Sequence, residues 1–405
     1  MDLVVFIGTE ATNMIIPRTI EPLLQERAAE MPVVTIYGPR QAGKTTLARK
    51  TFPSHSYANL ELPEIRSLAV QDPESFFRAF PAPAIIDEAQ RVPDLLSRIQ
   101  VRVDETGAPG QYILTGSHQP VLRAAVSQSL AGRTALLALL PLSRDELAAA
   151  GLAPPDAETA ILRGGLPRIH AASLRPDRIY EDYYRTYVER DVNLLVQVGN
   201  RLAFETFVRL LAGRVGQLVN FESMAGEIGV SAPTLRKWLS VLEASYVVFR
   251  LPPWHGNFGK RLVKTPKVYF TDTGLAAHLL RLRTPEQVGR DPLFGGLFEN
   301  YVVAEAMKWK ANAGRTEDFF FVRDTNGVEA DLALDAGREL HLFEIKAART
   351  PDAALAKNLR SLAKALPVKT ETVLCRASPF PIPGGGRFVP FERLCDRLDD
   401  VAGES

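Results

Sequence analysis

The sequence predicts an α/β protein, and three segments carry that prediction. Residues 33–37 form a short apolar run, residues 38–45 fit the pattern G-x-x-x-x-G-K-[ST], and residues 46–50 favour a helix. A second apolar run, 84–86, is followed by two acidic residues. Strand, glycine-rich loop and helix in this order are typical of a phosphate-binding loop, and a buried apolar strand is typical of a parallel sheet. We therefore expect a doubly wound sheet near the N-terminal end.

The glycine-rich segment has the chemistry of a nucleotide site. Backbone N–H groups of such a loop, and of the helix that follows, point toward phosphate oxygens. Lys44 is expected to reach the β- and γ-phosphates of ATP, and the hydroxyl of Thr45 is expected to bind Mg²⁺. The residues expected to hold the nucleotide are Gly38, Pro39, Arg40, Gln41, Ala42, Gly43, Lys44, Thr45 and Thr46. The alternative is a glycine-rich turn without a ligand.

The two acids after the second apolar run complete the predicted chemistry. Asp87 would hold Mg²⁺ through water, and Glu88 would polarise the water that attacks the γ-phosphate. The apolar run 111–114 leads to Thr115 and Ser117, which are placed like a polar sensor of the γ-phosphate. The alternative for this pair is an ordinary turn at a strand end.

Arg133 lies just before the last strand expected in the core, residues 134–142. In a ring-forming ATPase an arginine at this place would reach the nucleotide of the neighbouring subunit and stabilise charge in the transition state. The alternative is a surface arginine or a helix cap.

Length and composition limit the class of protein. With 405 residues, the chain has room for two or three domains. Lys plus Arg number 48 and Asp plus Glu 47, so nucleic-acid binding would need a local basic patch. The only cysteines, Cys375 and Cys395, lack metal-site spacing, and no apolar run has the length of a membrane span. We therefore expect a soluble, cytoplasmic protein.

Residues 201–290 predict a winged helix. Helical segments at 204–214, 220–229 and 230–243 are followed by two strand-like segments, 246–251 and 267–270. Basic residues on the helical segment 230–243 and on the wing would track DNA phosphates with little sequence preference: Arg236, Lys237, Lys260, Arg261, Lys264 and Lys267. The alternative is a module that packs against a protein or another subunit. Upstream, Tyr180, Tyr184 and Tyr187 recur at helical spacing, which indicates a packed face or, as the sharper alternative, base stacking.

Four polar residues in the last third form another pattern. Glu299 lies on an expected helix, Asp331 and Glu344 lie on two expected strands, and Lys346 follows the second strand. This arrangement resembles the PD-(D/E)xK nuclease fold. The resemblance implies that Asp331 and Glu344 bind Mg²⁺, that Lys346 orients water, and that Glu299 completes the metal shell. The alternative is a member of that fold which binds DNA or packs without cleavage.

Taken together, the motifs carry a resemblance over nearly the whole chain. The segments GPRQAGKTT, YANLE, AIIDEAQR, ILTGS, SLAGR, LLPLS and LRGGLP are similar to those of bacterial and archaeal AAA-type ATPases with a C-terminal uncharacterised domain. The resemblance implies an AAA+ P-loop ATPase core at 14–145, a helical lid at 146–200, the winged helix at 201–290, and a small α/β PD-(D/E)xK nuclease-like domain at 291–405. Residues 1–13 are expected to be a leader of uncertain order, with Met14 as an alternative start. The segment 164–167 is similar to a lid motif near the adenine, which implies that Pro167, and as a second residue Arg168, contact the nucleotide.

The expected function is a Mg²⁺-dependent ATPase that assembles as a homo-oligomer, with a hexameric ring as the expected form. It would couple hydrolysis to the binding, movement or remodelling of DNA, including branched DNA such as recombination junctions. Two alternatives remain open. One is a nucleotide-dependent switch that gates a protein partner, and the other is a DNA nuclease licensed by ATP.

Overall fold

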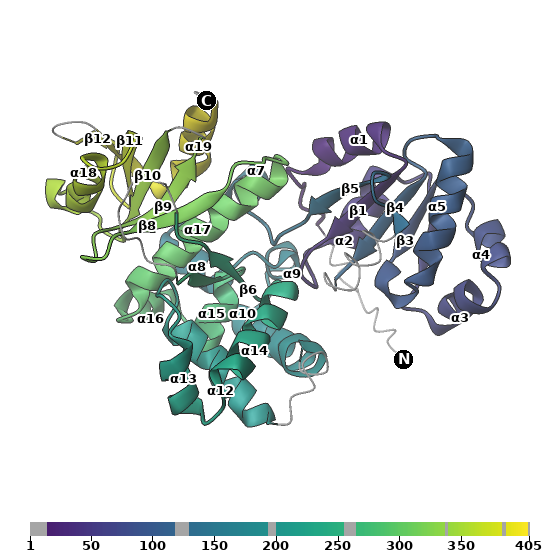
Figure 1. The fold of residues 1–405 in the computed structure, drawn as a ribbon, viewed down its shortest axis with the longest axis horizontal. Helices are drawn as coiled ribbons and strands as arrows, with labels where there is room; N and C mark the ends of the chain where they lie inside the picture. Colours follow the sequence, from purple (N-terminus) through teal and green to yellow (C-terminus); the bar gives the residue numbers. More distant parts are fainter. Residues whose placement is uncertain are drawn as a thin grey trace, which may run out of the picture.

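The computed structural model describes residues 14–117, 129–192, 200–254, 265–336, 339–382 and 386–403. Two sheets dominate the structure (Figure 1). The N-terminal sheet, with its helices in purple and blue, lies on one side of the molecule, and the C-terminal sheet, in green and yellow, lies on the other. A group of helices from the middle of the chain lies between and below them in this view.

The N-terminal sheet is parallel throughout, and its strand order is β2-β3-β4-β1-β5. The strands are β1 (Val33–Tyr37), β2 (Ser56–Asn59), β3 (Ala84–Asp87), β4 (Tyr112–Gly116) and β5 (Thr134–Ala138). The helices are α1 (Glu21–Glu30), α2 (Lys44–Thr51), α3 (Pro63–Gln71), α4 (Pro73–Ala79), the 3₁₀ helix η1 (Ala89–Arg91) and α5 (Asp94–Thr106). Separate apolar clusters cover the two faces of the sheet. Because β4 lies between β1 and β3, its polar end is placed between the glycine-rich loop and the acids.

The middle of the chain is mainly helical. It contains α7 (Arg144–Ala149), α8 (Ala157–Arg163), α9 (Pro167–Ala171), α10 (Pro176–Tyr183), the π-helix η2 (Tyr184–Val192), α12 (Arg201–Gly213), α13 (Phe221–Ile228), α14 (Ala232–Ala244), α15 (Thr273–Leu279) and α16 (Pro285–Arg290). Strands β6 (Val248–Leu251) and β7 (Lys267–Phe270) pair in an antiparallel ladder. Between α13 and α14 the chain turns at Gly229 with φ 77°, and Ser231 caps α14. Helices α12, α13 and α14 and the two strands overlap the segments that the sequence predicted for them.

The C-terminal sheet has the order β12-β13-β11-β10-β9-β8. Its strands are β8 (Phe319–Arg323), β9 (Glu329–Asp335), β10 (Leu340–Ile345), β11 (Val368–Cys375), β12 (Phe380–Pro381) and β13 (Arg387–Pro390). The long helix α17 (Phe294–Asn312) precedes the sheet, and η3 (Ala353–Ala356), α18 (Lys357–Ala363), η4 (Phe391–Arg393) and α19 (Leu394–Gly403) complete it. β10 pairs with β9 antiparallel and with β11 parallel. The two strands predicted to carry acids are therefore neighbours.

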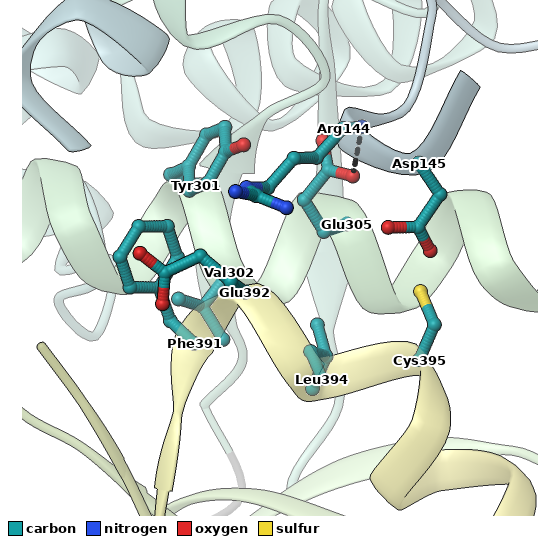
Figure 2. Close-up of a pocket in the computed structure, with 9 residues that line it drawn as sticks. All are labelled: Arg144, Asp145, Tyr301, Val302, Glu305, Phe391, Glu392, Leu394 and Cys395. Carbon is teal, nitrogen blue, oxygen red and sulfur yellow. Dashed lines mark hydrogen bonds between the residues drawn. The ribbon is translucent and has the colours of Figure 1, made fainter. Parts of the chain in front are cut away.

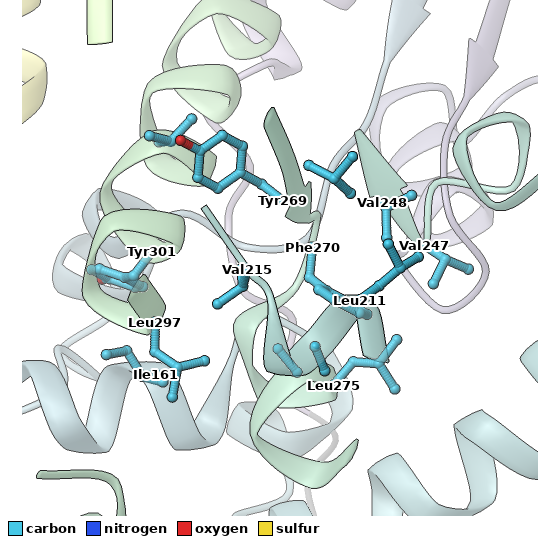
Figure 3. Packing of buried hydrophobic residues seen from close by; sticks show 14 of the residues in the cluster. Ile161, Leu211, Val215, Val247, Val248, Tyr269, Phe270, Leu275, Leu297 and Tyr301 are labelled. Carbon is cyan, nitrogen blue, oxygen red and sulfur yellow. The ribbon is translucent and has the colours of Figure 1, made fainter. Parts of the chain in front are cut away.

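One hydrophobic cluster joins the helical middle to the C-terminal sheet. Figure 3 shows part of it, where Ile161 of α8, Leu211 of α12 and Leu297 of α17 pack near Phe270 of β7. The cluster continues as far as Val401 in α19. Tyrosines 180, 184 and 187 belong to it and are buried, which favours packing over base stacking. Among the described helices, none is long and apolar enough to cross a membrane.

Candidate functional site

The glycine-rich loop joins β1 to α2, and its backbone requires glycine at the first position. Gly38 has φ 146°, and a Cβ on this residue would lie 2.1 Å from the carbonyl oxygen of Leu139. No side chain can occupy that space without displacing the strand-end backbone. Gly43, with φ 92°, lies directly before α2. The loop therefore leads directly into the N-terminus of α2, the arrangement on which phosphate sites are built.

Lys44 begins α2 and is 6 % exposed. Its Nζ donates hydrogen bonds to the carbonyl oxygens of Gly38, at 3.0 Å, and Pro39, at 2.7 Å. Burial lowers the pKa of Lys44 to about 8, although the charges of Glu88 and Asp87 act in the opposite direction. A buried ammonium held only by neutral carbonyl groups favours a nearby anion, so the side chain is poised to meet phosphate.

Thr45 and Asp87 meet at the mouth of the loop. The Thr45 hydroxyl lies 3.0 Å from each carboxylate oxygen of Asp87. Tyr57 donates to the same carboxylate at 2.9 Å, and Thr115 at the end of β4 donates to its other oxygen. Hydroxyl and carboxylate oxygens are the hard ligands that Mg²⁺ prefers, so the pair Thr45 and Asp87 fits this ion. Tyr57 is a partner that the sequence analysis missed.

Glu88 follows Asp87 and is held in an unusual backbone conformation. Its φ is 58°, in the left-handed region that side chains other than glycine rarely adopt. Its Oε2 accepts hydrogen bonds from Gln90 and, at 3.2 Å, from Ser117. The structure thus brings Glu88, Thr115 and Ser117 to one strand edge beside the loop. A carboxylate fixed in this way can accept a proton from a water next to the γ-phosphate.

A cavity of about 920 Å³ opens in front of these residues. Its polar lining includes Arg40, Gln41, Lys44, Thr45, Thr46, Asp87 and Glu88. Ile15, Pro167, Arg168 and Ala171, from outside the sheet and its loops, line the cavity as well. Pro167 approaches the loop, because a Cβ on Gly43 would lie 3.9 Å from its Cγ. The polar side suits a triphosphate, and the apolar side suits a base.

The glycine pair before Pro167 lies in a crowded place. A Cβ on Gly164 would lie 2.0 Å from an oxygen of Asp272 and 2.1 Å from the hydroxyl of Tyr180. Gly165 donates its N–H to Asp272 at 3.0 Å, and its carbonyl accepts from Leu142 at 2.7 Å. These contacts fix the start of α9 against Leu142, and Pro167, the first residue of α9, lines the cavity.

Arg18 lines the same cavity and supports the loop, and no sequence signal pointed to it. Its guanidinium donates to the carbonyl oxygens of Ala42 and Leu140, each at 2.7 Å, and to Glu146 at 2.9 Å. Glu146 also closes a capping box with Ser143 at the start of α7. One buried ion pair therefore connects the phosphate loop, the end of β5 and the first helix after the core.

Replacement of Arg18 by Met is expected to lower the free energy of unfolding by about 3–5 kcal/mol, because Glu146 would keep a buried charge without its partner. ATP affinity should fall as well, since the carbonyl of Ala42 in the loop loses its donor. Arg27→Met is the matched control, because its pair with Glu30 is exposed and worth about 0–1 kcal/mol. Chemical denaturation and calorimetric ATP titration measure the two effects. Equal stability of the two variants would contradict the supporting role.

Arg133 lies away from the nucleotide cavity of its own chain. Its carbonyl accepts from Val33, the first residue of β1, so the arginine is at the opposite sheet edge from the loop. Its guanidinium makes a two-point ion pair with Asp104 of α5, at 2.5 and 2.8 Å. Within one chain it therefore contributes nothing to the cavity, and its proposed action in a neighbouring subunit stays a prediction.

The predicted DNA-binding residues do not form one surface in the part of the chain that is described. Arg236 on α14 is exposed and lies 3.2 Å from Glu222, and Lys237 follows it on the same helix. Lys260, Arg261 and Lys264 lie outside the described residues. The prediction that Lys267 belongs to an exposed basic wing is wrong, since its side chain is 2 % exposed.

Lys267 instead enters a cluster of carboxylates. Its Nζ lies 2.9 Å from Glu299 of α17, 2.5 Å from Glu329 of β9 and 3.8 Å from Asp331 of β9. Tyr269 donates to the same Glu299 oxygen at 2.6 Å. Burial opposes the charge on Lys267, but the three carboxylates outweigh burial and hold its pKa above the usual value. Burial and the charge of Asp331 raise the pKa of Glu299 to about 7.

The second half of the cluster contains the other predicted acids. Asp331 accepts from the backbone N–H of Ile345 at 2.8 Å and from Lys346 at 3.1 Å. Lys346 also lies 2.7 Å from Oε1 of Glu344, whose Oε2 is buried without a hydrogen-bond partner. Burial and the charge of Asp331 raise the pKa of Glu344 to about 8.

The cluster fits a divalent cation only in part. Asp331 and Glu344 face each other across β9 and β10, but Glu299 is committed to Lys267 and Tyr269. Among the described residues, no group of three or more His, Cys, Asp or Glu side chains has the geometry to hold a metal ion. The prediction that Glu299 completes a metal shell is therefore not supported. Glu329 was missed, although its i, i+2 spacing to Asp331 places both on one face of β9.

The N-terminal unit is joined to the C-terminal helices through α7. Figure 2 shows Arg144 and Asp145 of α7 facing Tyr301 and Glu305 of α17, next to Cys395 of α19. The backbone N–H of Arg144 donates to Glu305 at 2.8 Å, and Lys308 donates to the carbonyl of Leu142 at 3.0 Å. These hydrogen bonds link the N-terminal unit to α17, the helix that precedes the C-terminal sheet.

Comparison with known proteins gives three matches along the chain. Residues 30–148 match a family model described as an AAA domain. Residues 155–286 and 294–394 match models described as domains of unknown function, DUF8612 and DUF4143.

Among solved structures, the Walker-type ATPase of Pyrococcus abyssi is similar with a TM-score of 0.42 and 16 % identity, over 66 % of this chain and 96 % of that one. A signal-transduction ATPase with numerous domains from Pyrococcus horikoshii gives a TM-score of 0.28 and 14 % identity, over 73 % of this chain and 48 % of that one.

Two uncharacterized proteins, from Mycobacterium tuberculosis and Mycobacterium bovis, are each 33 % identical to this chain over 338 residues. The match covers 82 % of this chain and 73 % of each relative. The AAA domain match falls on the sheet that carries Lys44, Thr45 and Asp87. The chain therefore belongs, with these mycobacterial proteins, to a family of AAA/P-loop ATPases.

Proposed function

We propose that this chain is a Mg²⁺-dependent ATPase of the AAA+ type whose hydrolysis site is the cavity in front of α2. The observation that carries the proposal is the contact between Thr45 and Asp87 at 3.0 Å, directly beside a buried Lys44. These three groups are the ones that a Mg²⁺-bound triphosphate needs at one place.

In this proposal the residues around the cavity have different roles in binding and hydrolysis. Lys44 exchanges its two carbonyl acceptors for phosphate oxygens, and the loop N–H groups bind the same anion. Thr45 and Asp87 would hold Mg²⁺, which when bound supplies charge neutralisation at the β- and γ-phosphates. Glu88 accepts a proton from the attacking water, while Gln90 and Ser117 keep its carboxylate in place. Pro167 and Arg168 border the part of the cavity that suits the base.

Homo-oligomerisation, with a hexameric ring as its form, is part of the same proposal. Arg133 is on the surface at the opposite sheet edge, so it can meet the cavity of a second chain but not its own. For this it must leave Asp104. Because that pair is exposed, its rupture costs little, about 0–1 kcal/mol.

We further propose that hydrolysis is coupled to DNA. The support is the helix-turn-helix of α13 and α14 with its antiparallel pair β6 and β7, which has the outline of a winged helix, together with the exposed Arg236 and Lys237 on α14. The hydrophobic cluster shared by α8, α12, α15 and α17 gives the helices around the cavity a rigid connection to this unit. The alternative within this framework is a nucleotide-dependent switch that gates a protein partner.

One experiment tests the coupling. ATP turnover by the wild-type protein is measured without DNA and with single-stranded, duplex and four-way-junction DNA at low salt. We expect Mg²⁺-dependent turnover that rises with DNA. Absence of turnover would refute the ATPase proposal. Turnover that ignores DNA, with no gel shift, would refute the coupling and favour the protein-gating switch.

A nuclease-like C-terminal sheet is a second candidate because one observation favours it. The buried Oε2 of Glu344 has no hydrogen-bond partner and lies beside Lys346 and Asp331, where the PD-(D/E)xK resemblance places its centre. The same DNA incubations, scored for nicking, test it. The candidate requires Mg²⁺-dependent nicking that Asp331→Asn abolishes, and intact DNA in all lanes would reject it.

A further inference from the structure

Five arginines line one cavity of about 590 Å³ in the helical middle of the chain. They come from separate elements that fold together: α10, η2, α12 and the segment that follows α15. The arginines are Arg178, Arg185, Arg209, Arg281 and Arg283, and the other lining residues are Asp177, Glu181, Tyr184, His278, Leu279 and Leu282. Tyr184 is one of the three recurring tyrosines described above, but neither the nucleotide site nor the acidic cluster uses this cavity.

The cavity carries an excess of positive charge. Its two carboxylates are already engaged, Asp177 with Arg175 at 2.7 Å and Glu181 with Arg185 at 2.6 Å. His278 is 3.4 Å from Glu181, and burial lowers its pKa, which disfavours the charged imidazolium. Five arginines less two acids leave a net charge of +3. Clefts lined by one sign of charge concentrate ions of the other sign.

Four of the guanidinium groups have no carboxylate partner among the residues that the structure describes. These are the groups of Arg178, Arg209, Arg281 and Arg283, and all four residues are exposed. Guanidinium groups bind phosphate through paired N–H donors, and they repel one another when no anion is present. A ligand with more than one phosphate would offset this repulsion.

The floor of the cavity differs from its rim. Tyr184 and His278 place their rings 6.3 Å apart, and Leu279 and Leu282 are each 8 % exposed. Tyr184, Leu279 and Leu282 are too buried to present a face on which a base could stack, so the exposed arginines of the rim carry the binding. A nucleic-acid backbone that follows positive charge fits such a rim. A duplex is stiff over many base pairs and cannot bend its backbone into a cavity of this size, whereas a single strand can.

The cavity is also one helix away from the nucleotide site. Arg178 and Glu181 lie on α10 on either side of Tyr180, whose hydroxyl donates to Asp272 at 2.7 Å and to the carbonyl of Arg163 at 3.1 Å. Asp272 in turn accepts from Gly165, next to the residues that border the base end of the nucleotide cavity. A ligand that orders α10 therefore acts on the same helix that holds this segment.

We propose that this arginine-lined cavity binds a single-stranded stretch of DNA through its phosphodiester backbone. The inference rests on the proposed coupling to DNA and deepens it, because it assigns the DNA contact to α10, η2, α12 and the segment after α15 instead of the wing.

The test is binding of a fluorescent single-stranded oligonucleotide, followed by anisotropy without ATP. The variant is Arg209→Glu with Arg283→Glu, and the matched control is Arg98→Glu, an exposed arginine of α5 outside every cavity described here. We expect the double variant to bind at least about tenfold more weakly, and the slope of log affinity against log salt to fall by about 1.4, or 0.7 for each lost phosphate contact. The control should bind like the wild type. Melting curves show whether each variant is folded, and Arg209→Gln with Arg283→Gln provides a milder second variant.

Each outcome decides the matter. Equal binding by wild type and both double variants would overturn this site while the DNA coupling stands. No binding by the wild type would overturn both. Complete competition by inorganic phosphate or a mononucleotide at millimolar concentration would show a site for free phosphate and overturn the assignment to a DNA strand. Normal binding with ATP turnover that ignores DNA would leave the site intact and refute the coupling.

Discussion

Glu88→Gln is expected to lower the turnover number for ATP hydrolysis by about 10²–10⁴-fold, with Mg²⁺·ATP affinity almost unchanged. The amide has the size of the carboxylate and can still accept hydrogen bonds from Gln90 and Ser117, so the geometry at the end of β3 is retained. What is lost is the group that takes a proton from water. Steady-state turnover and calorimetric ATP titration separate the two quantities.

Glu64→Gln is the matched control for this substitution. Glu64 is an exposed carboxylate on α3 and does not line the nucleotide cavity, so the same chemical change there should leave turnover as in the wild type. A Glu88→Gln protein that hydrolyses ATP within fivefold of the wild type would mean that another group activates the water. In that case Ser117 and Thr115, at the end of the neighbouring strand, would be the next residues to replace.

Lys267→Met should have a large effect on stability, with a loss of about 3–5 kcal/mol in the free energy of unfolding. The ammonium is the partner of Glu299 and Glu329 at 2.9 and 2.5 Å, and both carboxylates lie in a buried environment. Methionine fills a similar volume but removes the cation that compensates Glu299, while Glu329 keeps its ion pair with Arg323. Urea denaturation followed by tryptophan fluorescence measures the change. Lys310→Met is the control, because its partner Asp318 is 71 % exposed and does not become a buried unpaired charge.

The stability loss in Lys267→Met should also depend on pH. A carboxyl whose pKa in the folded state lies above its unfolded value favours the folded state at low pH, and this contribution disappears as pH rises through the folded pKa. Glu299 already has a pKa of about 7 with Lys267 present, and loss of the ammonium moves it higher. The variant should therefore be closest to the wild type at pH 5.5 and furthest from it at pH 8.5. A loss below 1 kcal/mol, or one independent of pH, would contradict the ion-pair assignment.

The geometry of the glycine-rich loop was predictable because consecutive residues specify it. Gly38, Lys44 and Thr45 act through one turn of backbone and the first residues of one helix, so eight consecutive residues specify the geometry. Asp87 and Glu88 could be added because parallel strands deliver their C-terminal ends to the same sheet edge. The strand order, with β4 between β1 and β3, agrees with that expectation.

Residues that act across long sequence separations were not predictable. Arg18 supports the phosphate loop, but its partner Glu146 lies 128 residues away, and nothing near Arg18 in the sequence marks it. Lys267 was interpreted as exposed because lysines at strand ends next to turns usually are. Its burial depends on Glu299 and Glu329, which reach it from α17 and β9 only after the C-terminal sheet has packed against β7. The charges could be counted in the sequence, but their pairing could not.

The uninterrupted apolar cluster from Ala157 to Val401 has a practical consequence for work on this protein. A truncation before α17 would leave the apolar faces of α8, α12 and β7 in water, and such a fragment should aggregate. The phosphate-loop unit, by contrast, has its own clusters on both faces of its sheet, and its contacts with the rest of the chain include Arg144, Leu142, the stacked rings of Tyr37 and Tyr246, and Arg40 over the ring of Tyr187. Dissection for biochemistry should therefore cut once, between these two parts, and keep everything downstream in a single piece.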